Sequence, residues 1–286
     1  MHKKQGSKIG SLLIVFLMTF LLFPQGIRAD MGPKPSVVVY LENLGGQTCY
    51  ATLLSEEAST GPYSTWNGQA KDARYKGNPY NEYDYLEYGK DIWQAFVDYA
   101  DQDPDHFYFL QKAWRVDESK ELAWTYYPPK TFKVLLYFPE TQTYAVSGIN
   151  FSYAFDSYFK TDVSQADPSL KPGNKADGAD LLLLNQSYNS KKEIASLLIR
   201  IALTVLVEML IALLFTFREK KQLLLILGVN VGTQIILNVL LNIINYRQGP
   251  LAFYIFYIFL ELVVIVIEAV LFYIYIPKVS NKAKAK

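Results

Sequence analysis

The sequence predicts a membrane protein that combines an antiparallel β-rich extracytoplasmic domain with a C-terminal bundle of three transmembrane α-helices. The last third of the 286-residue chain is almost continuously apolar, whereas its middle is polar and rich in tyrosine. Within the middle, short runs of β-branched and aromatic residues alternate with turn residues, which is typical of strands. The pattern fits a sandwich or a barrel equally well.

The chain begins with a basic segment, an apolar run and a small-residue end, all within residues 1–29. This order is typical of a secretory signal peptide. The apolar run, at 11–23, is shorter than the roughly 20 residues that a membrane span requires. We expect cleavage after Ala29; an uncleaved anchor is the alternative, and both place the next segment outside the cytoplasm.

Residues 30–163 are predicted to form the β-rich domain. We expect strands at 37–41, 48–54, 107–116, 122–127, 132–138, 143–146 and 149–159. Hairpin turns are expected at 45–46, 117–120 and 139–142. Apolar residues recur at helical spacing over 91–100, which predicts one short amphipathic helix. Prolines and glycines then indicate a linker over 164–192.

A tyrosine-rich segment lies between the second and third expected strands. Its tyrosines stand among glycine, asparagine and acidic residues, a composition that suits carbohydrate or peptide contact because tyrosine gives contact area at low entropy cost. The alternative is that the rings fold back on the sheet. The candidate surface residues are Tyr75, Tyr80, Tyr83, Tyr85 and Tyr88.

Three acids at 101, 103 and 105 are spaced like the start of a calcium-binding loop. However, His106 stands where such a loop requires glycine, and Lys112 stands where its bidentate acid should be. The sequence therefore excludes an EF-hand.

Three apolar segments, 194–217, 223–244 and 251–276, are each long enough to cross a hydrocarbon core of about 30 Å, and together they form a membrane region at 193–277. The loop 218–222 and the tail 278–286 are basic, so we expect both in the cytoplasm. This predicts a multi-pass plasma-membrane protein whose middle domain is extracytoplasmic.

The predicted spans contain polar and charged residues that are costly in hydrocarbon. Four amides in the second span recur every four residues and therefore share one helix face, which we expect to face the carboxylates. The candidate intramembrane network is Arg200, Glu208, Asn230, Gln234, Asn238, Asn242, Glu261 and Glu268.

Depth along each helix, at about 1.5 Å per residue, predicts which of these side chains meet. Glu208 falls level with Asn230, Glu261 falls level with Gln234, and Arg200 falls level with Asn238. Glu268 lies deeper and has no evident partner, whereas an arginine such as Arg200 either extends to the membrane surface or pairs with a glutamate. The network either joins three helices or serves as a proton or cation relay or a partner-docking face.

Composition and motifs exclude several function classes. The formal net charge of +1 gives no reason to expect nucleic-acid binding. Cys49 is the only cysteine and His2 and His106 are the only histidines, so neither a disulfide nor a histidine-rich metal site is expected. No nucleophile, Walker or dinucleotide motif is present. We expect neither an enzyme nor a cofactor or metal.

Two stretches, ADMGPKPS at 29–36 and YYPPKTFKVLLYFPE at 126–140, carry a resemblance beyond composition. With the three spans, the chain resembles uncharacterised predicted membrane proteins of Gram-positive bacteria that have a signal peptide, an extracytoplasmic domain and C-terminal transmembrane helices. The resemblance implies a bacterial plasma membrane and an exported domain, and it brings no activity or site residue.

These observations predict an integral membrane protein that displays an extracytoplasmic ligand- or partner-binding domain as part of a membrane complex. Its expected partners are the lipid bilayer and other membrane or envelope proteins. The alternative is a subunit of a proton- or cation-handling membrane complex that uses the intramembrane carboxylates.

Overall fold

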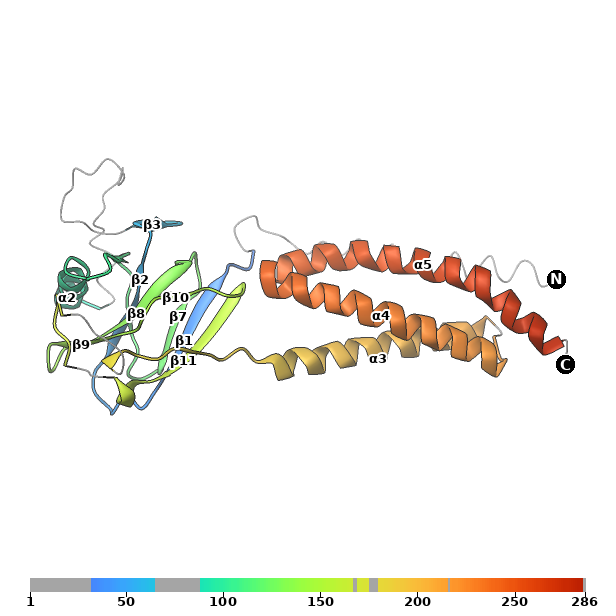
Figure 1. Ribbon diagram of the computed structural model, residues 1–286, viewed down its shortest axis with the longest axis horizontal. Helices are drawn as coiled ribbons and strands as arrows, with labels where there is room; N and C mark the ends of the chain where they lie inside the picture. Colours follow the sequence, from blue (N-terminus) through green and yellow to red (C-terminus); the bar gives the residue numbers. More distant parts are fainter. Residues whose placement is uncertain (1–31, 65–87, 167–168, 175–179, 216, 285–286) are drawn as a thin grey trace. The chain divides into compact units, whose positions relative to one another are not determined.

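The computed structural model describes residues 32–64, 88–166, 169–174, 180–215 and 217–284 (Figure 1). The chain divides into two compact units, Met1–Pro33 and Lys34–Lys286, and all elements described below belong to the second. The predicted signal peptide lies outside the described residues.

One sheet, sheet A, has the strand order β12-β11-β1-β7. Its strands are β12 (Asn185–Gln186), β11 (Asp156–Asp162), β1 (Ser36–Glu42) and β7 (Glu121–Trp124). β1 pairs with β7 and β11 with β12 in antiparallel fashion, but β1 and β11 run parallel along their whole length. Parallel pairing requires a long connection, and here almost the entire domain lies between the two strands.

The larger sheet, sheet B, is antiparallel and has the order β10-β8-β2-β5. Its strands are β10 (Asn150–Phe151), β8 (Thr131–Phe138), β2 (Tyr50–Ser55) and β5 (Tyr108–Phe109). Two more strands join it: β6 (Trp114–Arg115) pairs with β2, and β9 (Thr143–Val146) pairs with β8. A separate two-stranded ribbon is formed by β3 (Ser59–Thr60) and β4 (Tyr63–Ser64).

Alternate residues of both sheets point into one shared apolar core. Val37 and Val39 of β1 pack in the same cluster as Leu53 of β2 and as Val134 and Leu136 of β8. Because facing side chains of two sheets fill one core, the domain is a β-sandwich. The predicted fold class, a β-rich domain followed by three long apolar helices, is confirmed.

The other face of sheet B is covered by helix α2 (Lys90–Ala100) (Figure 1). Phe96 of this helix is fully buried, and its ring centroid lies 5.3 Å from that of Phe109 and 6.1 Å from that of Tyr137. The 91–100 periodicity thus predicted a real amphipathic helix. Sheet B is consequently buried on both faces, which explains why almost all of β8 is buried.

Of the three expected hairpins, one forms and two do not. β8 and β9 pair across the turn at 139–142, as predicted. β1 and β2 lie in different sheets, as do β6 and β7, so the hairpins at 45–46 and 117–120 were wrong. Glycines and polar residues mark a reversal of the chain, but in a sandwich that reversal can cross to the opposite sheet instead of closing a hairpin.

The segment expected as a linker is partly built into the sandwich. It begins with the 3-10 helix η1 (Val163–Gln165), and Leu170 and Leu182 are buried in the cores on either side of sheet B. Strand β12 then pairs with β11. The compact domain therefore extends past the predicted boundary at Val163, because isolated leucines among prolines and glycines still find apolar sites.

Helices α3 (Ser190–Leu214), α4 (Lys220–Gln248) and α5 (Pro250–Lys284) are long and apolar enough to cross a membrane. α4 packs against both α3 and α5. Between α4 and α5, Leu237 and Leu241 are buried against Val264. Most other large apolar side chains of the three helices are exposed, as expected for surfaces that contact lipid.

The single cysteine offers a first test of the sandwich. Cys49 is buried in the core, and burial, with a smaller effect of Asp117, raises the pKa of its thiol from 9.0 to about 12. Between these two values the unfolded chain loses the thiol proton and the folded chain keeps it. The neutral thiol therefore makes its full contribution to the free energy of unfolding below pH 9. Between the two pKa values this contribution falls by about 1.4 kcal/mol per pH unit.

We expect the free energy of unfolding of the sandwich to fall by about 1 kcal/mol more between pH 9 and 10 in the native chain than in a Cys49→Ala variant. All tryptophans of the chain lie between positions 66 and 124. Tryptophan fluorescence during denaturant unfolding in detergent therefore follows the sandwich and not the membrane helices. Equal pH slopes in the two proteins would contradict the prediction.

Candidate functional site

The predicted polar stripe lies on the buried face of α4. Asn230, Gln234 and Asn238 are 2%, 1% and 2% exposed, although they stand in the middle of an apolar helix. The Asn238 amide donates to the Gln234 backbone oxygen at 2.9 Å and to its side-chain oxygen at 3.3 Å. Since α4 packs between α3 and α5, the stripe faces the neighbouring helices rather than lipid.

Arg200 of α3 is held by amides. Its Nε donates to Asn238 Oδ1 at 3.0 Å, and its Nη2 donates to Asn242 Oδ1 at 2.8 Å. The guanidinium also stands 5.3 Å from the ring centroid of Phe253. In the described part of the chain it forms no ion pair with a glutamate. Depth counting placed Arg200 level with Asn238, which is one of its partners, but neither sequence-based alternative anticipated that asparagine oxygens would hold this cation.

Glu208 of α3 lies beside Asn230 of α4 and interacts electrostatically with Glu268 and Glu261 of α5. Its Oε2 is buried and has no hydrogen-bond partner among the described residues, and the same holds for Asn230 Oδ1. Depth counting thus placed Glu208 next to the correct amide. It did not predict that two acceptor atoms at this position would be left unsatisfied.

Glu268 has a partner, which corrects the expectation that it has none. The Thr233 hydroxyl of α4 donates to Glu268 Oε1, and the carboxylate side chain is largely buried. Thr233 stands outside the four-residue stripe of amides, so the stripe did not reveal it. Threonine hydroxyls often bond within their own helix, and here the same hydroxyl also lies 3.1 Å from two backbone oxygens of α4.

Glu261 lies near Tyr257 of its own helix and Gln234 of α4. The Nε2 of Gln234 nevertheless lacks a hydrogen-bond partner in the residues that the structure describes. The expectation that the amides donate to carboxylates holds for Asn230, which hydrogen-bonds to Glu208. It does not hold for Asn238 and Asn242, whose side chains bond to Gln234 and Arg200.

A cavity of about 230 Å³ opens between the three helices near the loop that joins α3 to α4. Glu208, Asn230 and Glu268 line it, and the rest of its wall is apolar. The apolar lining residues are Ile211, Ala212, Phe215, Phe217, Ile226, Phe272 and Ile276. Two carboxylates thus face a common space that contains little other polar surface.

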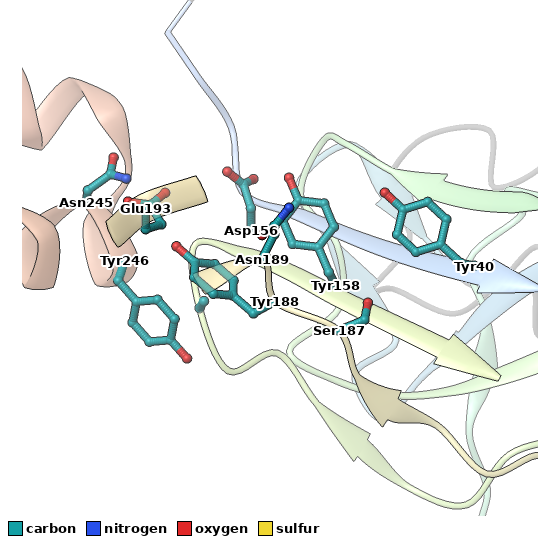
Figure 2. A pocket seen from close by; sticks show the side chains of 10 residues that line it. Tyr40, Asp156, Tyr158, Ser187, Tyr188, Asn189, Glu193, Asn245 and Tyr246 are labelled. Carbon is teal, nitrogen blue, oxygen red and sulfur yellow. The ribbon is translucent and has the colours of Figure 1, made fainter. Parts of the chain in front are cut away.

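A second site was not anticipated from the sequence. A pocket of about 430 Å³ is lined by four tyrosines and two carboxylates (Figure 2). Tyr40 and Tyr158 rise from neighbouring strands of sheet A, and Tyr246 comes from α4. The full lining is Tyr40, Ala154, Asp156, Tyr158, Ser187, Tyr188, Asn189, Glu193, Asn245 and Tyr246.

Hydrogen bonds and ring contacts position these side chains. Asp156 Oδ1 accepts a hydrogen bond from the Ser36 hydroxyl at 2.6 Å. The Tyr188 ring centroid lies 5.2 Å from that of Tyr246, nearly perpendicular to it. Burial, then the charge of Glu193 and a hydrogen bond to it, raise the pKa of Tyr188 to about 12, so the hydroxyl is a donor at neutral pH.

No local pattern in the sequence indicates this pocket, because its tyrosines are spread from position 40 to position 246. The tyrosine cluster that the sequence did single out is mostly elsewhere: Tyr75, Tyr80, Tyr83 and Tyr85 lie outside the described residues. Tyr88 is buried, and its hydroxyl donates to the Gln111 backbone oxygen at 3.2 Å.

No protein-family model matches the chain, and neither a curated protein nor a solved structure matches it.

Proposed function

We propose that the chain is a membrane-anchored binding protein that holds a small organic cation in the pocket lined by Tyr40, Tyr158, Tyr188 and Tyr246. The observation that supports this most directly is the chemistry of the lining: four tyrosines and two carboxylates, with no lysine or arginine among the described residues that line it. The volume of about 430 Å³ is in the range of ligand-binding pockets.

This lining favours a cation over an anion or an apolar molecule. Aromatic faces attract ammonium groups, with a free energy of about 0.5–2 kcal/mol each according to how far the site is desolvated. In the described part of the chain, neither Asp156 nor Glu193 forms an ion pair. Both carboxylates can therefore balance the charge of an ammonium group, whereas they would repel a phosphate or carboxylate.

We propose that this domain lies outside the cell. The basic loop 218–222 and the basic tail support this, because positive charge favours a cytoplasmic location for those segments. We propose that the helices anchor the domain in the plasma membrane and contact other membrane or envelope proteins there. The role is one of binding and not of catalysis.

A pair of probes tests the cation requirement. Choline and 3,3-dimethylbutan-1-ol have nearly the same shape, but only choline is charged. We expect choline to bind the full chain in lipid nanodiscs more tightly than its neutral counterpart by about 1 kcal/mol or more, roughly fivefold in Kd. Isothermal titration calorimetry measures both. Equal binding of the two probes, or no binding of choline, would contradict the proposal.

Two substitutions tie the binding to this pocket. Tyr40→Ala removes one aromatic wall, and Glu193→Gln removes one charge while keeping the side-chain shape, so both should weaken choline binding. Tyr127→Ala is the matched control, because Tyr40 and Tyr127 are both 40% exposed but Tyr127 does not line the pocket. If the control weakens binding as much as Tyr40→Ala does, the site is not this pocket.

A further inference from the structure

Two buried oxygen atoms, one on α3 and one on α4, cannot satisfy each other as they stand. Glu208 Oε2 and Asn230 Oδ1 are both acceptors, both buried, and both without a partner in the part of the chain that the structure describes. Asn230 is 2% exposed, and the two residues line one cavity. An unsatisfied buried acceptor is destabilising, and an unsatisfied buried carboxylate is more so.

A single proton would give both oxygen atoms a hydrogen-bond partner. A carboxylate that gains a proton becomes a hydroxyl donor, and an amide oxygen is a suitable acceptor for it. We propose that Glu208 is a proton-binding site of the membrane region, in which the bound proton on Oε2 is donated in a hydrogen bond to Asn230 Oδ1. The reaction is a simple association of H⁺ with the carboxylate, with no other bond formed or broken.

The charges around Glu208 favour this assignment. Glu268 and Glu261 face it from α5, and both are acidic. Glu268 already accepts from the Thr233 hydroxyl of α4, so it retains a bond as an anion. The nearby cation, Arg200, is held by Asn238 and Asn242. The Asn230 amide already hydrogen-bonds to Glu208, so a proton on Oε2 adds a second bond between the same two side chains in the opposite direction.

The cavity gives the proton a route. Its lining runs from Glu208 and Asn230 to Phe215 and Phe217, at the end of the bundle that carries the loop 218–222. A metal cation fits less well, because the described residues contain no group of three or more acidic, histidine or cysteine ligands. Sodium and calcium both require several oxygen ligands at once.

Infrared spectroscopy of the full chain in lipid nanodiscs tests the site directly, since the carbonyl stretch of a protonated carboxylic acid is separate from carboxylate bands. We expect such a band at neutral pH, and we expect it to lose intensity in Glu208→Gln, which preserves the shape of the protonated acid. Glu219→Gln is the control, because Glu219 is exposed before α4 and should contribute no acid band. A band that is unchanged in Glu208→Gln overturns the proposal.

Two further measurements test whether Asn230 holds the proton and whether the site binds sodium instead. Asn230→Leu keeps the acid but removes its acceptor, so the band should move to higher wavenumber; a band that does not move means that the proton is not held by Asn230. Replacing potassium chloride with sodium chloride at constant pH should leave the band unchanged. If sodium removes the band, the site binds sodium and the assignment to a proton is wrong.

Discussion

Replacing Lys133 with methionine should destabilise the β-sandwich by about 3–5 kcal/mol, because it leaves a buried carboxylate without its cation. Lys133 Nζ lies 2.6 Å from Asp103 Oδ1 and 2.8 Å from Asp105 Oδ2. The side chains of Lys133 and Asp103 are 4% and 0% exposed. Methionine retains most of the aliphatic part of the lysine side chain. The loss of stability therefore reports the removal of the ammonium charge and not a change in packing.

The rest of the Asp103 environment supports this expectation. Its Oδ2 accepts a hydrogen bond from the Phe107 backbone N–H at 3.0 Å, and the Lys133 ammonium lies 5.1 Å from the Phe107 ring centroid. Without Lys133, one backbone amide would remain to stabilise the buried anion. Two of the acids that are spaced like a calcium loop are thus the partners of an internal lysine.

Tryptophan fluorescence during urea unfolding of the full chain in detergent measures the loss. Arg115→Met is the matched control, because Arg115 pairs with Asp117 on the surface and its removal should change little. Adding Asp103→Asn to Lys133→Met should recover part of the stability, since a neutral amide needs no counter-ion. A loss below 1 kcal/mol for Lys133→Met alone would show that the pair is not buried in solution.

Periodicity and apolar length were enough to predict the helical parts of the fold. The three membrane helices and α2 follow from local pattern, because a helix satisfies its backbone hydrogen bonds within one segment. Strand pairing depends on segments that are distant in sequence. Local pattern therefore did not reveal that β1 pairs with β11 instead of with β2. A turn signal such as that at 45–46 indicates where the chain reverses, but it does not indicate which sheet the next strand joins.

The same contrast explains what was missed in the two sites. Along antiparallel helices, depth is nearly a linear function of residue number, so counting placed Glu208 beside Asn230. Counting from the expected boundaries placed Glu268 deeper than Thr233, and so it missed the bond from Thr233 to Glu268. The tyrosine pocket combines residues of strands and helices that are far apart in sequence, and no local pattern encodes such a meeting.

Replacing Trp124 with alanine should cost about 3–5 kcal/mol, because it removes the side chain that joins the two sheets through aromatic contacts. Trp124 of β7, in sheet A, is 1% exposed. Its ring centroid lies 5.2 Å from that of Trp114 of sheet B and 5.3 Å from that of Tyr63. No single neighbour can fill the space that an indole leaves, so a cavity should remain.

A second substitution separates packing from hydrogen bonding at this position. Trp124 Nε1 donates to the Tyr126 backbone oxygen at 2.9 Å. Trp124→Phe keeps an aromatic ring but loses this donor, so we expect a smaller loss, of about 1–2 kcal/mol. Phe151→Ala is the control, because that ring is exposed on β10 and its removal leaves the core unchanged.

Denaturant unfolding followed by the fluorescence of the remaining tryptophans ranks the three variants. If Trp124→Ala is no more destabilising than Phe151→Ala, the contact between the sheets does not depend on this side chain. If Trp124→Phe costs as much as Trp124→Ala, the bond from Nε1 to the Tyr126 oxygen, and not the filling of the core, is what the indole contributes. We expect Trp124→Ala to be much less stable than Trp124→Phe. The indole packs against side chains of both sheets, whereas its N–H forms one hydrogen bond.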